Sequence, residues 1–221
     1  MSECLLCQAE LRNKVAFTAI LRMYAPHQTV CTDCHQRFVE IGNSRCERCC
    51  KVEVTGVCTD CQQWERMGEQ VAHHALYPYD EEMAEYFQRF KFWGDYALRH
   101  VFAAEIRDAL KRYTDYSIVP IPVGPSRYQE RGFNQVAALL DAAEIRYHQL
   151  LAKADSDKQS SKSRSERLQS QQVFSLRDEK PVPEKILLVD DIYTTGATIR
   201  LAKGLLMKNG AKKIKSFSLA R

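Results

Sequence analysis

The sequence has no uninterrupted apolar run of 18 or more residues, so it offers no candidate for a membrane-spanning helix. Its first residues, Met1-Ser2-Glu3-Cys4, also lack the basic start and the apolar stretch of a signal peptide. We therefore expect a cytoplasmic protein without membrane insertion. The formal net charge of +4 is too small to indicate a class of partner by itself.

No cysteine follows residue 61, whereas all nine lie within the first 61 residues. Eight of the nine form C-x-x-C pairs, which are Cys4/Cys7, Cys31/Cys34, Cys46/Cys49 and Cys58/Cys61. In a reducing compartment this pattern favours metal over disulfides, because two such turns supply the four thiolates of a tetrahedral zinc site. The absence of a βαβ context argues against a redox motif. The sequence therefore predicts two structural zinc ions.

The pairing of the four C-x-x-C turns is open at this level. Sequential pairing joins the first turn to the second and the third to the fourth, like two zinc ribbons in tandem, whereas an interleaved arrangement joins the first to the third. The spacing is compatible with both. We favour the sequential form, because the short gap between Cys49 and Cys58 closes a compact loop at low entropic cost. Cys50 is left over, and we interpret it as a spare thiol.

Length and composition predict one core of ordinary size and a small accessory domain. We place a cysteine-rich zinc-binding domain at residues 1–66 and a second domain at residues 67–221, with Gln62–Glu69 as the connection. The small domain cannot bury enough apolar surface to fold unaided, so we expect zinc binding to stabilise it.

The second domain alternates amphipathic helices with short apolar strands. Helices are predicted over Glu82–Phe92, Leu98–Leu110, Gln135–Ala143 and Thr198–Lys208, and strands over Tyr116–Ile121, Lys185–Asp190 and Ile214–Leu219. This order predicts an α/β fold with a parallel sheet flanked by helices, whose ligands bind at the carboxyl ends of the strands. The polar stretch Lys153–Gln172 is predicted to be a loop, either a plain one or one that closes over a ligand.

The stretch from Ile186 to Thr198 combines an apolar strand, two acids and a helix start. Its polar and small residues are Asp190, Asp191, Thr194, Thr195, Gly196, Ala197 and Thr198. Amides at a helix start can hold a phosphate, and a glycine lets the backbone approach the phosphate oxygens. The two carboxylates can accept hydrogen bonds from ribose hydroxyls. A capped strand–helix junction alone would need only one acid and one threonine, and neither a Walker A loop nor the Rossmann glycine pattern is present.

This stretch resembles the motif with which type I phosphoribosyltransferases bind 5-phosphoribosyl 1-pyrophosphate (PRPP). The resemblance implies that Asp190 and Asp191 hold the ribose hydroxyls and that Thr194–Thr198 hold the 5′-phosphate. It also places Pro122–Gln135 as the pyrophosphate loop, with Arg131 as its charge partner. Magnesium is implied as the companion of PRPP.

Further motifs extend the resemblance to nearly the whole chain. Val119–Val123, Glu130–Gln135, Phe90–Asp95 and the cysteine pairs together resemble the ComF family. The resemblance implies a type I phosphoribosyltransferase-like domain behind a double zinc-ribbon-like domain, and a role in the uptake of single-stranded DNA during natural transformation.

The family resemblance also implies partners and leaves one alternative. The implied partners are PRPP, single-stranded DNA and ComFA, a helicase-like ATPase that would dock on the zinc domain and recruit the chain to the inner face of the membrane. The alternative is a phosphoribosyltransferase of nucleotide salvage or biosynthesis that acts on a base or an amine. No residues for a particular base are recognisable, which favours the binding role.

Overall fold

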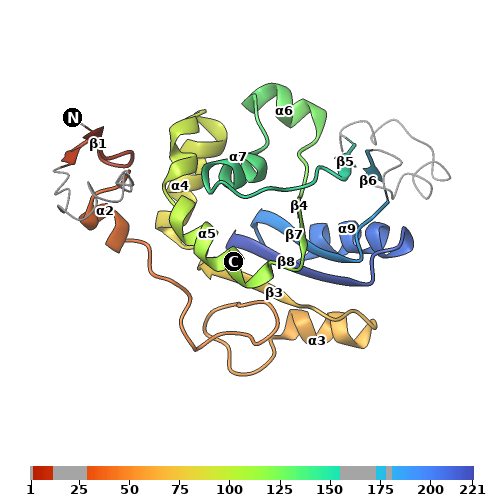
Figure 1. Cartoon of the computed structure of the whole chain (residues 1–221). Helices are drawn as coiled ribbons and strands as arrows, with labels where there is room; N and C mark the ends of the chain where they lie inside the picture. Colours follow the sequence, from red (N-terminus) through yellow and green to blue (C-terminus); the bar gives the residue numbers. More distant parts are fainter. Residues whose placement is uncertain (1, 12–28, 155–172, 178–180) are drawn as a thin grey trace.

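The computed structural model describes residues 2–11, 29–154, 173–177 and 181–221. Its centre is a four-stranded parallel sheet with the strand order β3-β8-β7-β4 (Figure 1). The strands are β3 (His73–Tyr77), β4 (Ser117–Pro120), β7 (Lys185–Ile192) and β8 (Lys213–Ala220). The parallel α/β sheet and three of its strands confirm the prediction, whereas β3 is not among the predicted strands.

Strand β7 is buried on both faces, which is why it consists of a continuous apolar run. Leu187 and Val189 pack into the core formed with helices α4 (Glu81–Phe92), α5 (Ala103–Leu110) and α7 (Gln135–Ala142). Ile186 and Leu188 pack into the opposite core, with helix α9 (Ala197–Lys208). Successive side chains of a strand point to opposite faces, so one strand supplies both cores.

The predicted helix over Leu98–Leu110 is wrong in its first half. The structure has a 3-10 helix, η1 (Tyr96–His100), followed by a turn and then α5. In a continuous α-helix the carbonyl of Leu98 would accept the N–H of Phe102. Here that carbonyl accepts the N–H of Val101 at 3.0 Å and the hydroxyl of Tyr86 at 3.2 Å, so the α-helical pattern begins only after Phe102.

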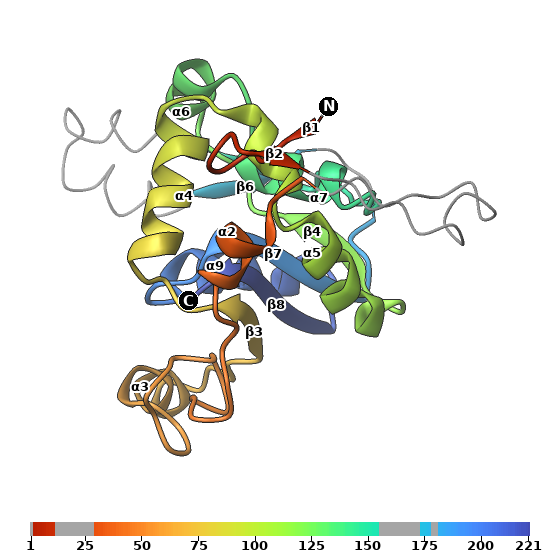
Figure 2. The same ribbon diagram turned by 90° about the vertical axis from the view of Figure 1, so that its left-hand side faces the viewer.

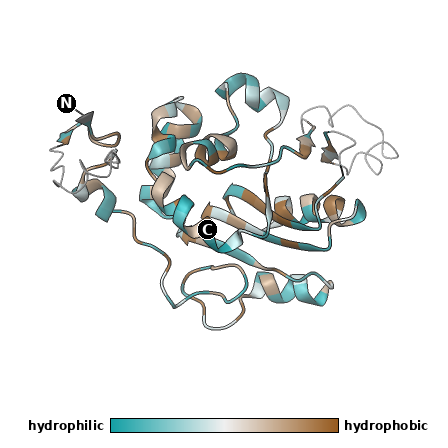
Figure 3. Cartoon of the chain, in the orientation of Figure 1, coloured by the Kyte–Doolittle hydropathy of each residue, from teal (hydrophilic) through white to brown (hydrophobic). Residues whose placement is uncertain are grey.

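The segment Pro122–Gln135, predicted as a loop, contains helix α6 (Pro125–Arg131). Proline stands at its first position, and Gly132 ends it with a φ of 79°, a conformation that favours glycine. No residue of α6 is buried, and Figure 3 shows the helix as hydrophilic along most of its length. Helix α6 therefore stands on the surface at the edge of the sheet.

The described residues of the cysteine-bearing part have little regular structure. It contains the hairpin β1 (Ser2–Glu3) and β2 (Glu10–Leu11) and the helices α2 (Thr32–Gln36) and α3 (Thr59–Arg66). Helix α3 covers most of the predicted connection, which is therefore helical as far as Arg66. Within the described ranges, the remaining elements are the 3-10 helix η2 (Lys111–Tyr113) and the antiparallel pair β5 (Leu151–Lys153) and β6 (Phe174–Leu176).

The two halves of the cysteine-bearing part pack at different places on the sheet domain. Figures 1 and 2 show α2 beside α4 and α5, whereas α3 lies apart from α2 on the side of β3. Cys4 and Cys34 belong to the core of α4 and α5, and Cys46 and Cys61 belong to the core of α9. The division at residue 66 stays a prediction. No helix of the described stretches is long and apolar enough to span a bilayer.

Candidate functional site

A cavity of about 1100 Å³ opens at the carboxyl ends of β4 and β7, where a parallel sheet of this kind binds its ligands. Asp190 and Asp191 line it from the end of β7, and Thr198 lines it from the first turn of α9. Among the residues that the structure describes, four basic ones also line the cavity, namely Lys91, Arg127, Arg131 and Lys153. The cavity therefore suits an anionic ligand.

Asp191 is the more deeply embedded of the two acids. Its Oδ2 atom pairs with Nζ of Lys91 at 2.7 Å, and the two side chains are only 9% and 11% exposed. Burial alone would raise the pKa of Asp191. The Lys91 ammonium outweighs burial, together with hydrogen bonds from Gln135 and from the N–H of Ile192, and lowers the pKa below its ordinary value. Asp191 is thus held as a carboxylate.

Asp190 behaves in the opposite way. Burial and the neighbouring Asp191 carboxylate raise the pKa of Asp190 well above its ordinary value, although the N–H of Asp191 and the charge of Lys91 act against this rise. As the pH rises, Asp191 therefore loses its proton first, and Asp190 loses its proton only at higher pH. Two adjacent acids held in different protonation states are typical of a binding or catalytic site.

The loop 193–198, named here with the first two residues of α9, leads from the end of β7 into that helix and requires a glycine at one position. Gly196 has a φ of 80°, and a Cβ atom there would lie 2.2 Å from the hydroxyl of Tyr193. Thr194 and Thr195 are exposed, and the Oγ1 atom of Thr195 accepts the N–H of Ala197 at 3.4 Å. The loop thus presents hydroxyls at the start of a 12-residue helix, whose N-terminus carries partial positive charge.

The structure brings the predicted site residues together in part. Asp190, Asp191, Thr198 and Arg131 line one cavity, and Thr194–Ala197 belong to the loop beside it. Arg131 ends α6, donates to Oε1 of Gln135 at 3.2 Å and lies 5.1 Å from the ring centroid of Phe92. Burial and the charge of Arg127 lower the pKa of Arg131. Beyond residue 154, the predicted loop Lys153–Gln172 lies outside the described residues.

Lys91 is the site residue that the sequence analysis does not assign. It lies on α4, 100 positions before Asp191, so no local pattern connects the two residues. The available signal is its position between Phe90 and Phe92, on a helix whose apolar stripe faces the core. Lysine is mostly exposed and is almost never buried unless it is paired, so the burial of Lys91 agrees with its pairing to Asp191.

The cysteines form two clusters, each with four sulfur atoms within 4.8 Å of one another. The first cluster consists of Cys4, Cys7, Cys31 and Cys34, and the second of Cys46, Cys49, Cys58 and Cys61. Sequential pairing is therefore confirmed. Cys50 lies outside both clusters, with its thiol 3.7 Å from the carbonyl of His73, which agrees with its interpretation as a spare thiol.

The sulfur geometry fits zinc in both clusters. Tetrahedral zinc with Zn–S bonds of about 2.3 Å places its sulfur atoms about 3.8 Å apart. Cys7 and Cys31 have their sulfur atoms 3.8 Å apart, and Cys49 and Cys58 have theirs 3.7 Å apart. All four ligand positions are filled by protein, as in structural zinc sites.

The thiols of each cluster differ in pKa. Burial would raise the pKa of Cys4 and Cys46, but backbone N–H groups outweigh it and lower the two values to about 6 and about 7. Burial and the neighbouring cysteines raise the pKa of Cys34 and Cys61. Four thiolates this close repel one another, so a divalent cation would stabilise their full deprotonation and release protons as it binds.

The purified chain is expected to contain two zinc ions, because eight paired cysteines make two complete thiolate shells. Elemental analysis of the wild-type protein measures this. Cys58→Ser should remove the ion of the second cluster, and Cys7→Ser should remove that of the first, so that each variant retains one. A wild-type protein with a single ion, or with none, would contradict the prediction.

Comparison with known proteins agrees with this geometry. The family model described as phosphoribosyl transferase domain matches residues 101–221. Competence protein ComFC of Streptococcus pneumoniae is 44% identical over 219 residues, which cover 99% of this chain and 100% of that protein. The chain belongs to the ComF family. Competence protein ComFC of Bacillus subtilis, a further member, is 33% identical over 99% of this chain and 94% of that protein.

The ComF family assignment confirms the resemblance read from the motifs, and the match to the phosphoribosyl transferase domain confirms the fold class. Among solved structures, a hypoxanthine phosphoribosyltransferase of Staphylococcus aureus is 14% identical, with a TM-score of 0.33, over 56% of this chain and 63% of that one. A likeness at this level has no bearing on ligand or mechanism.

Proposed function

We propose that this chain is a competence protein that binds PRPP with magnesium at the cavity beside β7 and acts in the uptake of single-stranded DNA. The observation that carries the proposal is the joint placement of Asp190, Asp191 and the loop 193–198 at the carboxyl end of one parallel strand. The competence role follows from the names of its ComF relatives, which align over the full length of the chain.

The cavity offers a partner for each part of PRPP. The ribose hydroxyls would donate to the carboxylates of Asp190 and Asp191. The 5′-phosphate would accept hydrogen bonds from the loop 193–198 and the first turn of α9. The pyrophosphate would face the basic residues of the cavity, with Arg131 among them.

Magnesium would enter with the pyrophosphate group, because this cation prefers oxygen ligands and is usually bound by carboxylates together with substrate phosphates. The carboxylates that line the cavity are those of Glu130, Asp190 and Asp191. The pKa of Asp190 is raised above the ordinary carboxyl value near 4. A cation bound beside Asp190 is expected to lower this pKa, because a positive charge stabilises the carboxylate. Magnesium would thus help to ionise the second acid.

The direct test is the melting temperature of the chain with and without PRPP and Mg²⁺. A rise with PRPP supports the proposal, and no rise at millimolar PRPP contradicts it. Ribose 5-phosphate and pyrophosphate, added separately, show which half of the ligand the cavity recognises.

Exposed aromatic side chains beside the cavity support single-stranded DNA as a further ligand. Phe92 and Trp93, at the end of α4, are 70% and 69% exposed, and the guanidinium of Arg131 lies over the ring of Phe92. Aromatic faces on which bases can stack, next to cations that attract phosphates, are typical of surfaces that bind single strands.

The zinc-bearing part is the proposed docking surface for ComFA. Among its described residues this part exposes the large apolar side chain of Val39, after α2, and that of Met67 follows directly at the end of α3, with exposed fractions of 67% and 63%. Methionine is enriched in protein interfaces relative to the rest of the surface. Structural zinc sites make the surrounding backbone rigid, which lowers the entropic cost of docking.

The double variant Val39→Asp/Met67→Asp is expected to weaken ComFA binding by roughly tenfold or more, because charges replace apolar anchors. Capture of purified ComFA at a series of concentrations measures the change. Met207→Asp is the matched control, since Met207 is an apolar residue of α9 that is 43% exposed. Equal capture of all three proteins would place the docking surface elsewhere.

A transferase reaction is the second candidate function, and a second cavity favours it. This cavity, of about 420 Å³, is lined by Tyr96, Tyr128, Phe133 and Tyr147 among others. Pro122 and Val123 line both cavities, so the two lie on either side of the segment after β4. A planar acceptor could stack there. Release of pyrophosphate from PRPP on addition of a nucleobase or an amine would favour the transferase over a purely binding role.

A further inference from the structure

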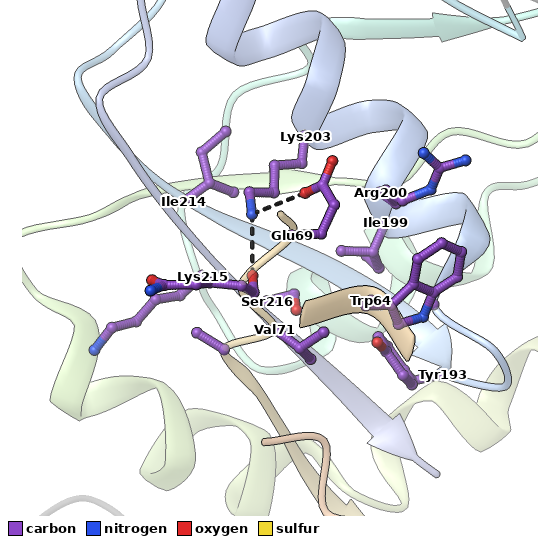
Figure 4. A pocket seen from close by; sticks show the side chains of 13 residues that line it. Trp64, Glu69, Val71, Tyr193, Ile199, Arg200, Lys203, Ile214, Lys215 and Ser216 are labelled. Atoms are coloured by element: carbon purple, nitrogen blue, oxygen red, sulfur yellow. Dashed lines mark hydrogen bonds and ion pairs between the residues drawn. The ribbon is translucent and has the colours of Figure 1, made fainter. Parts of the chain in front are cut away.

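The loop 193–198 is held from behind by the helix that carries the second cysteine cluster. Helix α3 begins directly after Cys58, contains Cys61 and presents Trp64 one turn later. The indole Nε1–H of Trp64 donates to the carbonyl oxygen of Thr195 at 3.1 Å. The guanidinium of Arg200, from α9, lies 4.9 Å from the indole ring, and Figure 4 shows Trp64 beside Arg200 and close to Tyr193.

A second contact joins the same cluster to the same loop. The Nη2 atom of Arg221 lies 3.4 Å from the sulfur of Cys49, and its Nη1 atom donates to the carbonyl oxygen of Tyr193 at 3.4 Å. Only 9% of the Arg221 side chain is exposed. The ring of Tyr193 stacks on His73 at 3.9 Å between centroids. One buried cation therefore touches a predicted metal ligand and the first residue of the loop.

These two contacts determine where the loop can offer hydrogen-bond donors. In a planar trans peptide the C=O and the following N–H point in opposite directions. Because Trp64 holds the carbonyl of Thr195, the N–H of Gly196 points away from α3. Because Arg221 holds the carbonyl of Tyr193, the N–H of Thr194 points away from the second cluster. Donors that are oriented before the ligand arrives need little reorganisation on binding.

A metal ion held by the second cysteine cluster would complete this arrangement from the far side. With zinc bound, the four thiolates fix the start of α3 and hence the place of Trp64. Lys203 of α9 adds a further link to the chain after α3, since its ammonium donates to the carbonyl of Gln70 at 3.0 Å and pairs with Glu69 at 3.4 Å (Figure 4). Loss of the metal would release α3 and its hold on the loop.

We propose that Trp64 and Arg221 are positioning residues that couple metal occupancy of the second cysteine cluster to ligand affinity at the loop 193–198. The identity of the ligand in this coupling rests on the proposed PRPP site. It is reciprocal by thermodynamic linkage, so PRPP slows zinc loss from the second cluster as zinc strengthens PRPP binding. The first cluster packs into the core of α4 and α5, and its metal serves as the internal comparison.

The decisive variant is Trp64→Phe, which keeps an aromatic ring beside Arg200 but removes the donor to Thr195. Hydrogen exchange of the hydrogen-bonded amides of this segment, those of Tyr193 and Ala197, is expected to become roughly 3- to 10-fold faster without ligand, because the segment loses one hydrogen bond that holds it. The affinity for PRPP, measured by calorimetry, should fall by a similar factor. Asn209→Ala is the matched control, because it also removes one side-chain donor to a backbone carbonyl, that of Leu205 at 2.8 Å, but at the opposite end of α9.

The metal provides an independent readout. Transfer of zinc to a chromogenic chelator should show two phases in the wild type, one for each cluster. PRPP should slow only the phase of the second cluster. Cys7→Ser identifies the phase of the first cluster by removing it. In Trp64→Phe the slowing by PRPP should shrink. Arg221→Lys is the second variant, because a lysine cannot hold Cys49 and Tyr193 at once.

The outcomes separate this proposal from the proposed function. Unchanged exchange of 193–198 in both Trp64→Phe and Arg221→Lys would overturn the coupling, whether or not PRPP binds. A wild-type chain that binds no PRPP, while the loop exchanges faster in the variants, would contradict the PRPP site and leave the positioning role supported. Equal slowing of both zinc phases by PRPP would show a global stabilisation instead, and would also overturn the coupling.

Discussion

Lys91→Met is expected to destabilise the chain by about 3–5 kcal/mol at neutral pH, because it leaves a buried carboxylate without its cation. The Asp191 and Lys91 side chains are 9% and 11% exposed, so water cannot replace the lost ammonium well. Chemical denaturation at pH 7 measures the loss. The helix itself should persist, since methionine is a good helix former of similar length.

The control and the pH dependence follow from the same pair. Lys91→Met/Asp191→Asn removes both charges and should recover most of the lost stability. In the wild type the pKa of Asp191 is lowered, so the pair contributes stability above the ordinary carboxyl pKa of about 4 and loses it as the pH falls through the lower folded value. In Lys91→Met the pKa of Asp191 should rise, and the gap to the wild type should close in acid. A gap that is independent of pH would contradict this assignment.

The local features of the fold follow from the sequence because their signals are local. Strand β7 is a continuous apolar run, and helix α4 shows apolar residues at helical spacing after the capping residue Asp80, whose side chain accepts the N–H of Met83 at 3.0 Å. The short gap between Cys49 and Cys58 favours the sequential pairing of the cysteines that the structure shows. Each signal lies within a few residues of the structure that it predicts.

Strand β3 escapes prediction because its polar residues are satisfied by a distant strand. His73 and His74 begin it, and histidine pairs are not typical of a buried strand. The ring nitrogens of His73 bond to the hydroxyls of Ser216 and Ser218 on β8, at 2.9 and 3.0 Å. Burial lowers the pKa of His73, so the ring stays neutral. His73 can therefore be buried in a strand only where β8 supplies the hydroxyls that bond to its ring.

The deepest parts of the candidate site depend on contacts between residues far apart in the sequence. Trp64 and Thr195 are 131 positions apart, and Lys91 and Asp191 are 100 positions apart. A motif identifies the acids and the loop, but the partners that set their protonation and their orientation come from α3 and α4. Such pairings carry no periodicity, so only the fold shows them. The site therefore depends on more of the chain than its motif.

PRPP with Mg²⁺ is expected to raise the melting temperature of the chain by roughly 5–10 °C at a hundredfold excess over its dissociation constant, where binding to the folded state adds about 2.7 kcal/mol. Thr195→Glu should abolish the rise, because it puts a negative charge where the 5′-phosphate would bind. The side chain of Thr195 is exposed, and its backbone contact with Trp64 does not depend on the hydroxyl, so the fold should survive. Thermal denaturation at several PRPP concentrations measures both effects.

Two further variants make the result specific to the site. Asp190→Asn should reduce the rise without abolishing it, because the ribose hydroxyls lose a charged acceptor while the phosphate contacts remain. Met207→Glu adds the same charge as Thr195→Glu to the opposite end of α9 and should keep the full rise, since a helix N-terminus favours anions only within its first turn. If Thr195→Glu retains the full rise, or if Met207→Glu also loses it, the loop 193–198 is a capped strand–helix junction and the phosphate binds elsewhere.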